Sequence, residues 1–519
     1  MSGIQNLFPE WNDHYEYMEK MFADVHHFCA DEIRKLDPDA KVGLEGTFGN
    51  HNIELMMDKL DWWGPYSNLL EDELIRSLYP DRPRFIWIGY HKERTMTYPH
   101  TLLDALLKGV VNGNAWYALS DDFPHGILAI DYTDSYAKKY MDEFRRLRFG
   151  TAQQLIHTPL AQHGVGIFWN HNSKRASKAD PRCSNPETSI APLLRYSYRN
   201  GVNIEFVTAR TLDRLKDMKI LFLCGISSFS DKESAAIIDF VKNGGTVIAD
   251  LYPGVFNENL KKQNRNPLAE LFGDILLKNQ PANQVKPLRT PLMKASAALT
   301  NPAGPYMVQK NCGKGKAILM NFSFSVIETS ALPATPFDDF VSGMLNSAGV
   351  KISHSATAKA TLRIRKGKGY DLIGVIPEEY SKPVAITLPE KAYIYECGRG
   401  ETDKEMKKSF TVEPGNTPLR IFAAFAEKQP VPELILPETA QPGDKLEIPL
   451  TSIPAGQFAV LRIFDPSGKE LTSLSQVIKV HRASRMSFAF PFNAVCGQYR
   501  FLLQNFTTGL AVEKSVTLQ

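Results

Sequence analysis

The sequence predicts an α/β protein that ends in all-β domains. Residues 219–249 follow a strand, helix, strand pattern within a chain of 519 residues. Helical and extended patterns also alternate over residues 15–119, whereas after about residue 350 only short strands with Gly and Pro turns follow. The predicted architecture is therefore a partial (β/α) barrel, a doubly wound α/β domain and two β-sandwich-like domains.

The strand, helix, strand unit has strong local signals. Lys219 to Cys224 is an apolar run too short for a helix, and Thr246 to Ala249 is a second such run. Between them, Ser230 and Glu233 have the spacing of a capping box, and Asn243-Gly244-Gly245 ends the helix. A unit of this length predicts two parallel strands joined by a right-handed crossover.

The first 130 residues contain four helices, each followed by a strand. The helices are predicted at residues 15–36, 52–60, 70–78 and 101–111, and the strands at 41–47, 62–66, 84–90 and 115–119. Four such units make half of an eight-stranded barrel. The sequence therefore predicts a half-barrel over residues 1–133.

The remaining boundaries come from changes of pattern. A charged helix over 134–158 connects the half-barrel to the α/β domain at 159–352, and a small β domain covers 353–427. Residues 428–437 are rich in proline and form a linker. About seven short strands in 438–519 predict an immunoglobulin-like sandwich.

Composition excludes several classes of protein. The net charge of +3 is small and no long basic run exists, which gives nucleic-acid binding no support. No apolar run reaches the ~18 residues of a membrane span, and the N-terminus lacks the pattern of a signal peptide. As written, the chain is expected in the cytoplasm; secretion requires a natural start further upstream. The six cysteines are scattered singly without a CxxC pair, which favours buried thiols over a zinc site.

Two runs of the α/β domain carry a resemblance to a known family: they read "GVGIFWNHNSKRAS" (Gly164–Ser177) and "FSDKESAAIIDFVKNGGTVIADLYPGVFNEN". They resemble the trimerisation domain of family 42 β-galactosidases, which has a glutamine-amidotransferase-like fold. The runs "DEIRKLDPDAKVGLEGTF", "RPRFIWIGYH" and "LLDALLKGVVNGNAWYALS" resemble the regions of barrel strands five, seven and eight. The resemblance implies hydrolysis of a terminal glycoside with retention, no cofactor and a homotrimer.

The same resemblance implies an incomplete catalytic pair. Retaining hydrolysis needs two carboxyl groups about 5 Å apart. The family has its acid/base Glu on strand four, which has no counterpart before Met1, and its nucleophile Glu at the end of strand seven. There this chain has Gly89 or Tyr90, with Glu93 only in the following loop. We therefore expect an inactive chain, or one that needs a second chain to supply the N-terminal half-barrel.

One carboxylate of the chain is a candidate for catalysis. Glu45 lies near the carboxyl end of a predicted barrel strand, on the face where barrel enzymes hold their sites; the alternative is a polar residue that lines the barrel mouth or pairs with a lysine. Asp121, with Asp122, could bind sugar hydroxyls or only shape a turn.

Aromatic residues and a histidine are candidates for substrate binding, because aromatic faces stack on sugar rings. Core packing is the alternative for each aromatic residue, and a structural role is the alternative for the histidine. The candidates are Trp63, Tyr66, Trp87, Tyr90, His91 and Trp116.

Three other motifs are rejected. Cys224 lacks the Gly-x-Cys-x-Gly elbow and the His-x-Glu pair that a cysteine nucleophile of an amidotransferase needs. The glycine-rich run at residues 311–316 lacks the spacing of a phosphate loop and predicts a hairpin turn. His26, His27 and His51 form no metal-ligand set with nearby acids.

Two functional hypotheses remain open. The first is a glycoside-hydrolase-like protein that is incomplete or inactive as a single chain. The second is a non-catalytic carbohydrate-binding or scaffolding protein, in which the cleft of a degenerate barrel still holds a sugar.

Overall fold

The structure is a computed structural model of the chain. The described residues are 8–45, 52–64, 68–88, 98–109, 112–115, 147–180, 182–273, 296–301, 304–320, 322–326, 337–357, 360–379, 382–413 and 419–519. They divide into two compact units. The first comprises residues 1–87, 162–198 and 202–352, and the second residues 88–161, 199–201 and 353–519.

The first unit begins with alternating helices and strands in the predicted order. The elements are α1 (Phe8–Leu36), β1 (Gly43–Glu45), α2 (Ile53–Met56), β2 (Trp62–Gly64), α3 (Leu69–Leu78) and β3 (Phe85–Ile88). β1 pairs with β2 in parallel, and Trp63 forms a parallel bridge with Arg84. This is the pairing expected of barrel strands, although the half-barrel itself stays a prediction.

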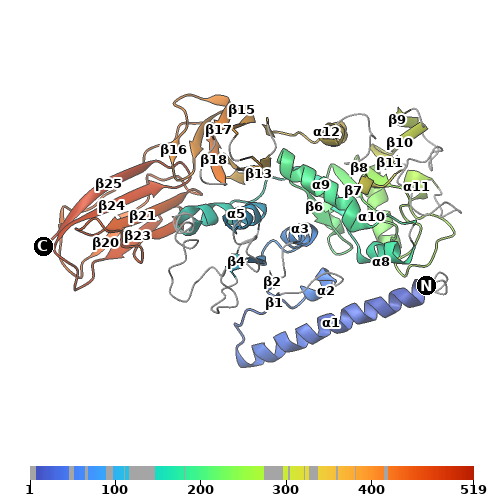
Figure 1. Cartoon of the computed structure of the whole chain (residues 1–519), viewed down its shortest axis with the longest axis horizontal. Helices are drawn as coiled ribbons and strands as arrows, with labels where there is room; N and C mark the ends of the chain where they lie inside the picture. The colour runs from blue at the N-terminus through green and yellow to red at the C-terminus, as the bar shows by residue number, and fades with distance from the viewer. Residues whose placement is uncertain are drawn as a thin grey trace. The chain divides into compact units, whose positions relative to one another are not determined.

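A mostly parallel sheet follows in the same unit (Figure 1). Among the described residues its strand order is β6-β5-β7-β8-β11-β10-β9, with β10 and β9 antiparallel. The strands are β5 (Val165–Phe168), β6 (Glu205–Val207), β7 (Ile220–Leu223), β8 (Thr246–Asp250), β9 (Ser296–Asn301), β10 (Gly304–Cys312) and β11 (Gly315–Met320). The helices are α8 (His171–Ala179), α9 (Pro186–Asn200), η2 (Leu212–Asp217), α10 (Asp231–Lys242), α11 (Ala269–Phe272), η3 (Phe324–Val326) and α12 (Phe337–Ser347).

Helices cover both faces of this sheet, as a doubly wound domain requires. Ile220 and Phe222 of β7 share a core with residues of α9 and α12. The alternate residues Leu221 and Leu223 share a second core with α10. Successive side chains of a strand point to opposite faces, so this apolar strand contributes to two cores.

The central strand, helix, strand unit has the predicted geometry. β7 and β8 pair in parallel, and α10 connects them. The Ser230 side chain accepts a hydrogen bond from the Glu233 backbone N–H, and Glu233 accepts one from the Ser230 N–H, which completes the capping box. The hairpin of β10 and β11 turns at Gly313-Lys314, as predicted for the glycine-rich run.

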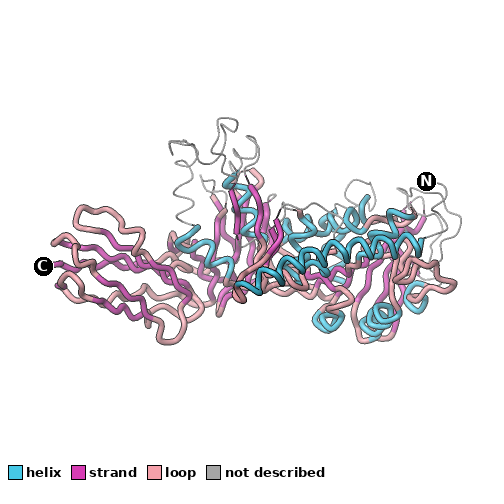
Figure 2. The backbone as a smooth tube through the Cα atoms, turned by 90° about the horizontal axis from the view of Figure 1, so that it is seen from below, coloured by secondary structure: helices cyan, strands magenta, loops and turns pink. Residues whose placement is uncertain are grey.

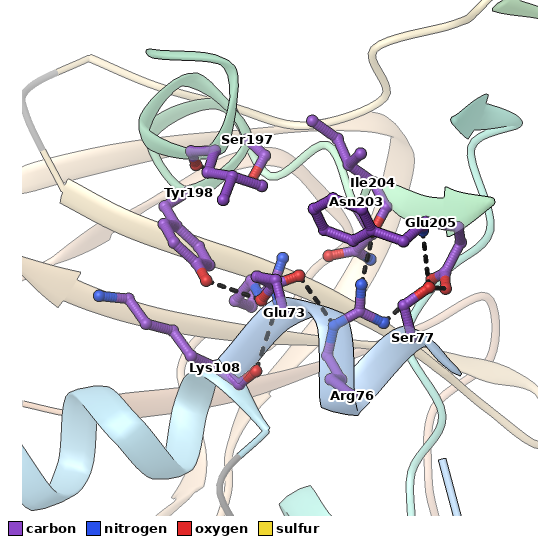
Figure 3. A network of polar contacts seen from close by, with 12 residues as sticks. Glu73, Arg76, Ser77, Lys108, Ser197, Tyr198, Asn203, Ile204 and Glu205 are labelled. Atoms are coloured by element: carbon purple, nitrogen blue, oxygen red, sulfur yellow. Dashed lines mark hydrogen bonds and ion pairs between the residues drawn. The ribbon is translucent and has the colours of Figure 1, made fainter. Parts of the chain in front are cut away.

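A buried polar network joins α3 to β6 and α9 (Figure 3). The Arg76 guanidinium donates to Glu73 (2.9 Å), to Glu205 (3.0 Å) and to the carbonyl oxygen of Ile204 (2.5 Å). Tyr198 of α9 donates its hydroxyl to Glu73 at 2.6 Å. The helix that follows β2 is thereby fixed to the edge strand of the parallel sheet.

The second unit contains two β assemblies preceded by short helices. Its first elements are α5 (Tyr98–Lys108), β4 (Asn112–Ala115), the π-helix η1 (Leu147–Thr151) and α7 (Ala152–Ile156). The predicted helix over 134–158 is therefore described only from residue 147 onward. The small β sheet comprises β12 (Ser355–Ala356), β13 (Ala360–Gly367), β14 (Tyr370–Pro377), β15 (Val384–Glu396), β16 (Gly400–Glu401), β17 (Lys407–Val412) and β18 (Arg420–Phe425).

Residues 438–519 form a two-sheet sandwich of seven strands (Figure 2). One sheet has the order β19-β25-β24-β21-β22, and β20 pairs with β23 in the other. The strands are β19 (Thr439–Ala440), β20 (Lys445–Pro449), β21 (Phe458–Phe464), β22 (Gln476–Lys479), β23 (Arg485–Ala489), β24 (Gly497–Asn505) and β25 (Ala511–Leu518). Side chains of both sheets share one core.

Candidate functional site

The catalytic candidate Glu45 is the last residue of β1. Its side chain is exposed, whereas Leu44 before it is buried in the core. A side chain at position 43 would clash with the Trp62 ring, which lies directly against the Gly43 backbone. The sequence thus presents Glu45 to solvent at the carboxyl end of a parallel strand, where barrel enzymes place reactive groups. A catalytic role for Glu45 stays a prediction.

Trp63 is the one aromatic candidate whose side chain is described. It is fully buried and packs in the same core as Leu44. This is the environment expected of a residue that packs in the core. For Trp87 only the backbone in β3 is described. Tyr66, Tyr90, His91, Trp116 and Asp121 lie outside the described residues, so their roles in substrate binding also stay predictions.

The first turn of α3 carries a titratable carboxyl that sequence reasoning missed. Asn68 caps this helix directly after β2, which places Glu71 and Asp72 on the carboxyl-end side of the strands. Burial, and then the Asp72 charge, raise the pKa of Glu71 to about 7. Asp72 itself forms an ion pair with the buried Arg84. The signal in the sequence was the Glu-Asp pair after a strand, which also suits a helix N-terminus and gives no hint of burial.

Cations of α8 lie near the same face. Lys174 pairs with Glu187 at 2.6 Å, and Arg175 pairs with Glu16 of α1 at 3.0 Å. Desolvation raises the pKa of Glu19 despite the charge of Arg175. A carboxyl with a raised pKa can hold a proton near neutral pH and release it to a leaving oxygen. Shifted pKa values of this kind also occur in purely structural ion-pair networks.

Asp250 lies at the carboxyl edge of the parallel sheet. Its carboxylate accepts hydrogen bonds from the backbone N–H groups of Gly225 (2.7 Å) and Phe324 (3.2 Å). Burial raises its pKa to about 6. Doubly wound folds bind ligands at this edge, but here the buried Asp250 holds together the loops that follow β7 and β11.

Cys224 cannot act as a nucleophile in this environment. The thiol is fully buried, and desolvation raises its pKa well above the usual value. Because the thiolate is the reactive form, the structure agrees with the rejection of amidotransferase chemistry.

A pocket of about 660 Å³ opens at the opposite, amino edge of the sheet. Lys216 and Lys219 line it together with Phe240 and the Gly244-Gly245 turn. The Lys219 ammonium already donates to the carbonyl oxygen of Gly349 at 3.0 Å. The pocket is partly apolar and lies away from the carboxylates described above.

Among the comparisons with known proteins, only those with solved structures found matches. No protein-family model matches the sequence, and no curated protein matches it. Within the described ranges, no helix has both the length and the apolar composition that crossing a bilayer requires.

Three GH42 β-galactosidases illustrate the structural likeness. A catalytic mutant of Gan42B from G. stearothermophilus has 14% identity and a TM-score of 0.56, over 76% of this chain and 65% of that one. The enzyme of Bacillus circulans sp. alkalophilus has 12% identity and a TM-score of 0.61, over 80% and 68%. That of Rahnella sp. R3 has 15% identity and a TM-score of 0.60, over 82% and 69%.

This chain therefore spans about two thirds of the length of these enzymes. At such identities the likeness establishes the fold and leaves the activity open. In fold, the chain is similar to the GH42 β-galactosidases.

Proposed function

We propose that this chain is a glycoside-hydrolase-like protein related to β-galactosidases, and that it does not complete a hydrolytic site by itself. The observation that carries the proposal is Glu45, an exposed carboxylate at the carboxyl end of a parallel strand. Its place matches the face on which barrel enzymes hold their carboxylates. The likeness to GH42 structures supports a glycoside as the class of ligand.

The reaction needs a second carboxyl group. Retaining hydrolysis pairs a nucleophile with an acid/base about 5 Å away. The sequence resemblance assigns the acid/base to a strand with no counterpart in this chain, so we propose that a second polypeptide supplies it. Assembly as a homotrimer likewise remains an expectation of the resemblance.

Hydrolysis of a panel of nitrophenyl glycosides, β-galactoside first, tests this proposal. We expect no turnover above buffer by the purified chain. The variant Glu45→Gln and the control Glu390→Gln, an exposed carboxylate on β15, are assayed beside it. Turnover that is lost only in Glu45→Gln would show that this chain alone holds a working site.

A binding measurement separates the two functional hypotheses. Isothermal titration calorimetry of the chain with galactose and with lactose reports binding without turnover. Saturable binding with no hydrolysis would favour the non-catalytic carbohydrate-binding protein over the incomplete hydrolase.

A further inference from the structure

The pocket at the amino edge of the parallel sheet has the dimensions of a ligand site. Its volume of about 660 Å³ falls within the range of about 300–1,000 Å³ that small-molecule sites occupy. Its lining comes from η2, the two residues before β7, α10 with the turn after it, and the residue after α12, all in the first unit. The lining residues are Leu212, Asp213, Leu215, Lys216, Met218, Lys219, Ala236, Phe240, Asn243, Gly244, Gly245 and Ala348.

The floor of the pocket is apolar. Leu215 is 5% exposed and Phe240 is 9% exposed, so both belong to the core beneath the pocket. The Phe240 ring lies against the backbone of Gly245, where an added side chain would come within 2.3 Å of the ring. An apolar ring or chain of a ligand would gain free energy by covering this floor.

Small residues keep the pocket open. Ala236 lies one turn before Phe240 on the same side of α10, and Ala348 lines the pocket from the end of α12. The backbone of Gly244 has a φ of 118°, a conformation that favours glycine over a residue with a larger side chain. A large side chain at position 236 or 348 would therefore occupy space that is now empty.

Lys219 places a cation at the rim of this pocket. Its ammonium donates a hydrogen bond to the carbonyl oxygen of Gly349 at 3.0 Å, and Gly349 directly follows the lining residue Ala348. An ammonium group has three N–H donors. Within the described part of the chain one of them has an acceptor, so two N–H groups of a positioned cation remain for a ligand.

The charges of the lining residues favour a ligand with one negative charge. Asp213 and Lys216 are three residues apart in the 3-10 helix η2, where such residues lie on the same side and their charges offset each other. Lys219 remains as the uncompensated charge of the lining. A carboxylate fits a net charge of this size better than a phosphate monoester, which has a charge of about −1.5 to −2.

The nearby end of α10 competes little with Lys219. The carbonyl groups at the C-terminus of a helix attract cations when they lack partners. Here the Val241 carbonyl oxygen accepts a hydrogen bond from the Gly244 N–H at 3.0 Å. The Lys242 carbonyl oxygen accepts one from the Lys314 N–H at 2.9 Å. With these carbonyl groups paired, the ammonium of Lys219 selects the charge of the ligand.

We propose that this pocket binds a small organic carboxylate, whose apolar body packs on Leu215 and Phe240 and whose acidic group is held by Lys219. The site is distinct from the carboxyl end of β1, where Glu45 lies. The inference therefore does not depend on the proposed function.

Two fluorescent probes test the proposal on the full chain. Anilinonaphthalene sulfonate is a monoanion with an apolar body, and N-phenylnaphthylamine is its neutral counterpart. Lys219→Met is expected to weaken binding of the anion about tenfold, the effect of one hydrogen bond to a charged group, and to leave binding of the neutral probe unchanged. Lys219→Arg should retain the affinity for the anion. The control Lys232→Met, at an exposed position of α10 outside the pocket, should change neither affinity.

Filling the pocket tests the apolar floor. Ala236→Trp is expected to weaken binding of both probes about tenfold, and Ala348→Trp serves the same purpose if that variant does not fold. The absence of saturable binding of the anion would overturn the proposal. So would equal affinities of the anion for wild type and Lys219→Met, or for wild type and a folded tryptophan variant.

Hydrogen exchange locates the bound anion. The probe is expected to slow exchange of the amides in η2 and in the turn at Gly244-Gly245. The exposed apolar side chains of α1 are the alternative place for such a probe, and exchange there should not change. Protection of α1 without protection of η2 would overturn the assignment of the pocket.

Discussion

Arg76 and Glu205 form a largely buried ion pair, with Nη1 and Oε1 3.0 Å apart, between α3 and β6. The two residues are far apart in sequence, and the pair sits within a network that also includes Glu73 and Tyr198 (Figure 3). Both carboxylates share one guanidinium, so the loss of Arg76 would leave two buried charges uncompensated.

Replacement of Arg76 by Met should therefore destabilise the first unit strongly. Removing one partner of a buried ion pair typically costs about 3–5 kcal/mol of the free energy of unfolding. Arg500→Met removes the exposed pair with Glu513, at 2.8 Å, and should cost less than about 1 kcal/mol. Urea unfolding, with hydrogen exchange of the α3 amides as the local probe, measures both. Similar losses in the two variants would contradict the assignment of a buried network.

The capping box of α10 gives a smaller and more local effect. Ser230→Ala removes the acceptor for the Glu233 backbone N–H and should lower the free energy of unfolding by about 0.5–2 kcal/mol. Ser230→Thr retains a hydroxyl oxygen and should recover most of that loss. If the threonine variant unfolds as easily as the alanine variant, the side-chain cap does not stabilise the helix.

Glu71 should make stability depend on pH. Its pKa is raised to about 7 in the folded chain, from an ordinary value of 4.5, so the folded carboxyl holds its proton more tightly than the unfolded one. The resulting stabilisation is complete below pH 4.5 and is lost as the pH rises to about 7.

Glu71→Gln removes this titration. Relative to wild type, the free energy of unfolding of the variant should increase by about 1–3 kcal/mol between pH 5 and pH 8, since only the wild type must bury a charge. Denaturant unfolding at both pH values measures the difference, with Glu390→Gln as an exposed control. If wild type and Glu71→Gln differ by the same free energy of unfolding at both pH values, the pKa of Glu71 is not raised in the folded chain.

The cysteines should divide into two classes of reactivity. Cys29 and Cys496 are exposed, whereas Cys183, Cys224, Cys312 and Cys397 are buried. N-ethylmaleimide should add twice to the native chain within minutes and six times in denaturant. Mass spectrometry counts the adducts. Rapid modification of Cys224 would contradict its burial and reopen its chemistry.

Local signals explain which parts of the fold could be predicted. Ser230, Glu233 and the Gly244-Gly245 pair define α10 within sixteen residues, and the strands on either side are continuous apolar runs. The turn at Gly313 is equally local, because its backbone φ of 58° favours glycine. Such elements need no knowledge of distant contacts.

Other elements depend on distant partners and were predicted less well. β15 runs through Pro389 without a break, from Val384 to Glu396, because β17 pairs with it on both sides of a register shift. α1 begins at Phe8 rather than Tyr15, since the Phe8 ring packs against Phe256, 5.9 Å away between centroids.

The candidate site shows the same limit. The position of Glu45 near the carboxyl end of a strand could be predicted from the short extended stretch at residues 41–47. The raised pKa of Glu71 could not, because its main cause is burial, which depends on how distant parts of the chain pack around α3. Burial of Trp63 likewise arises from the packing of several helices.

Asp250 also bears on how this domain can change over evolution. In a doubly wound sheet the crevice at the carboxyl ends of the strands is where new specificities usually arise. Here the buried Asp250, which binds the loops after β7 and β11, lies at that edge. Substitutions at Asp250 would therefore reduce the amount of folded protein, whatever sugar is present. A mutational scan should find this position equally intolerant under every growth condition, and variation should accumulate elsewhere.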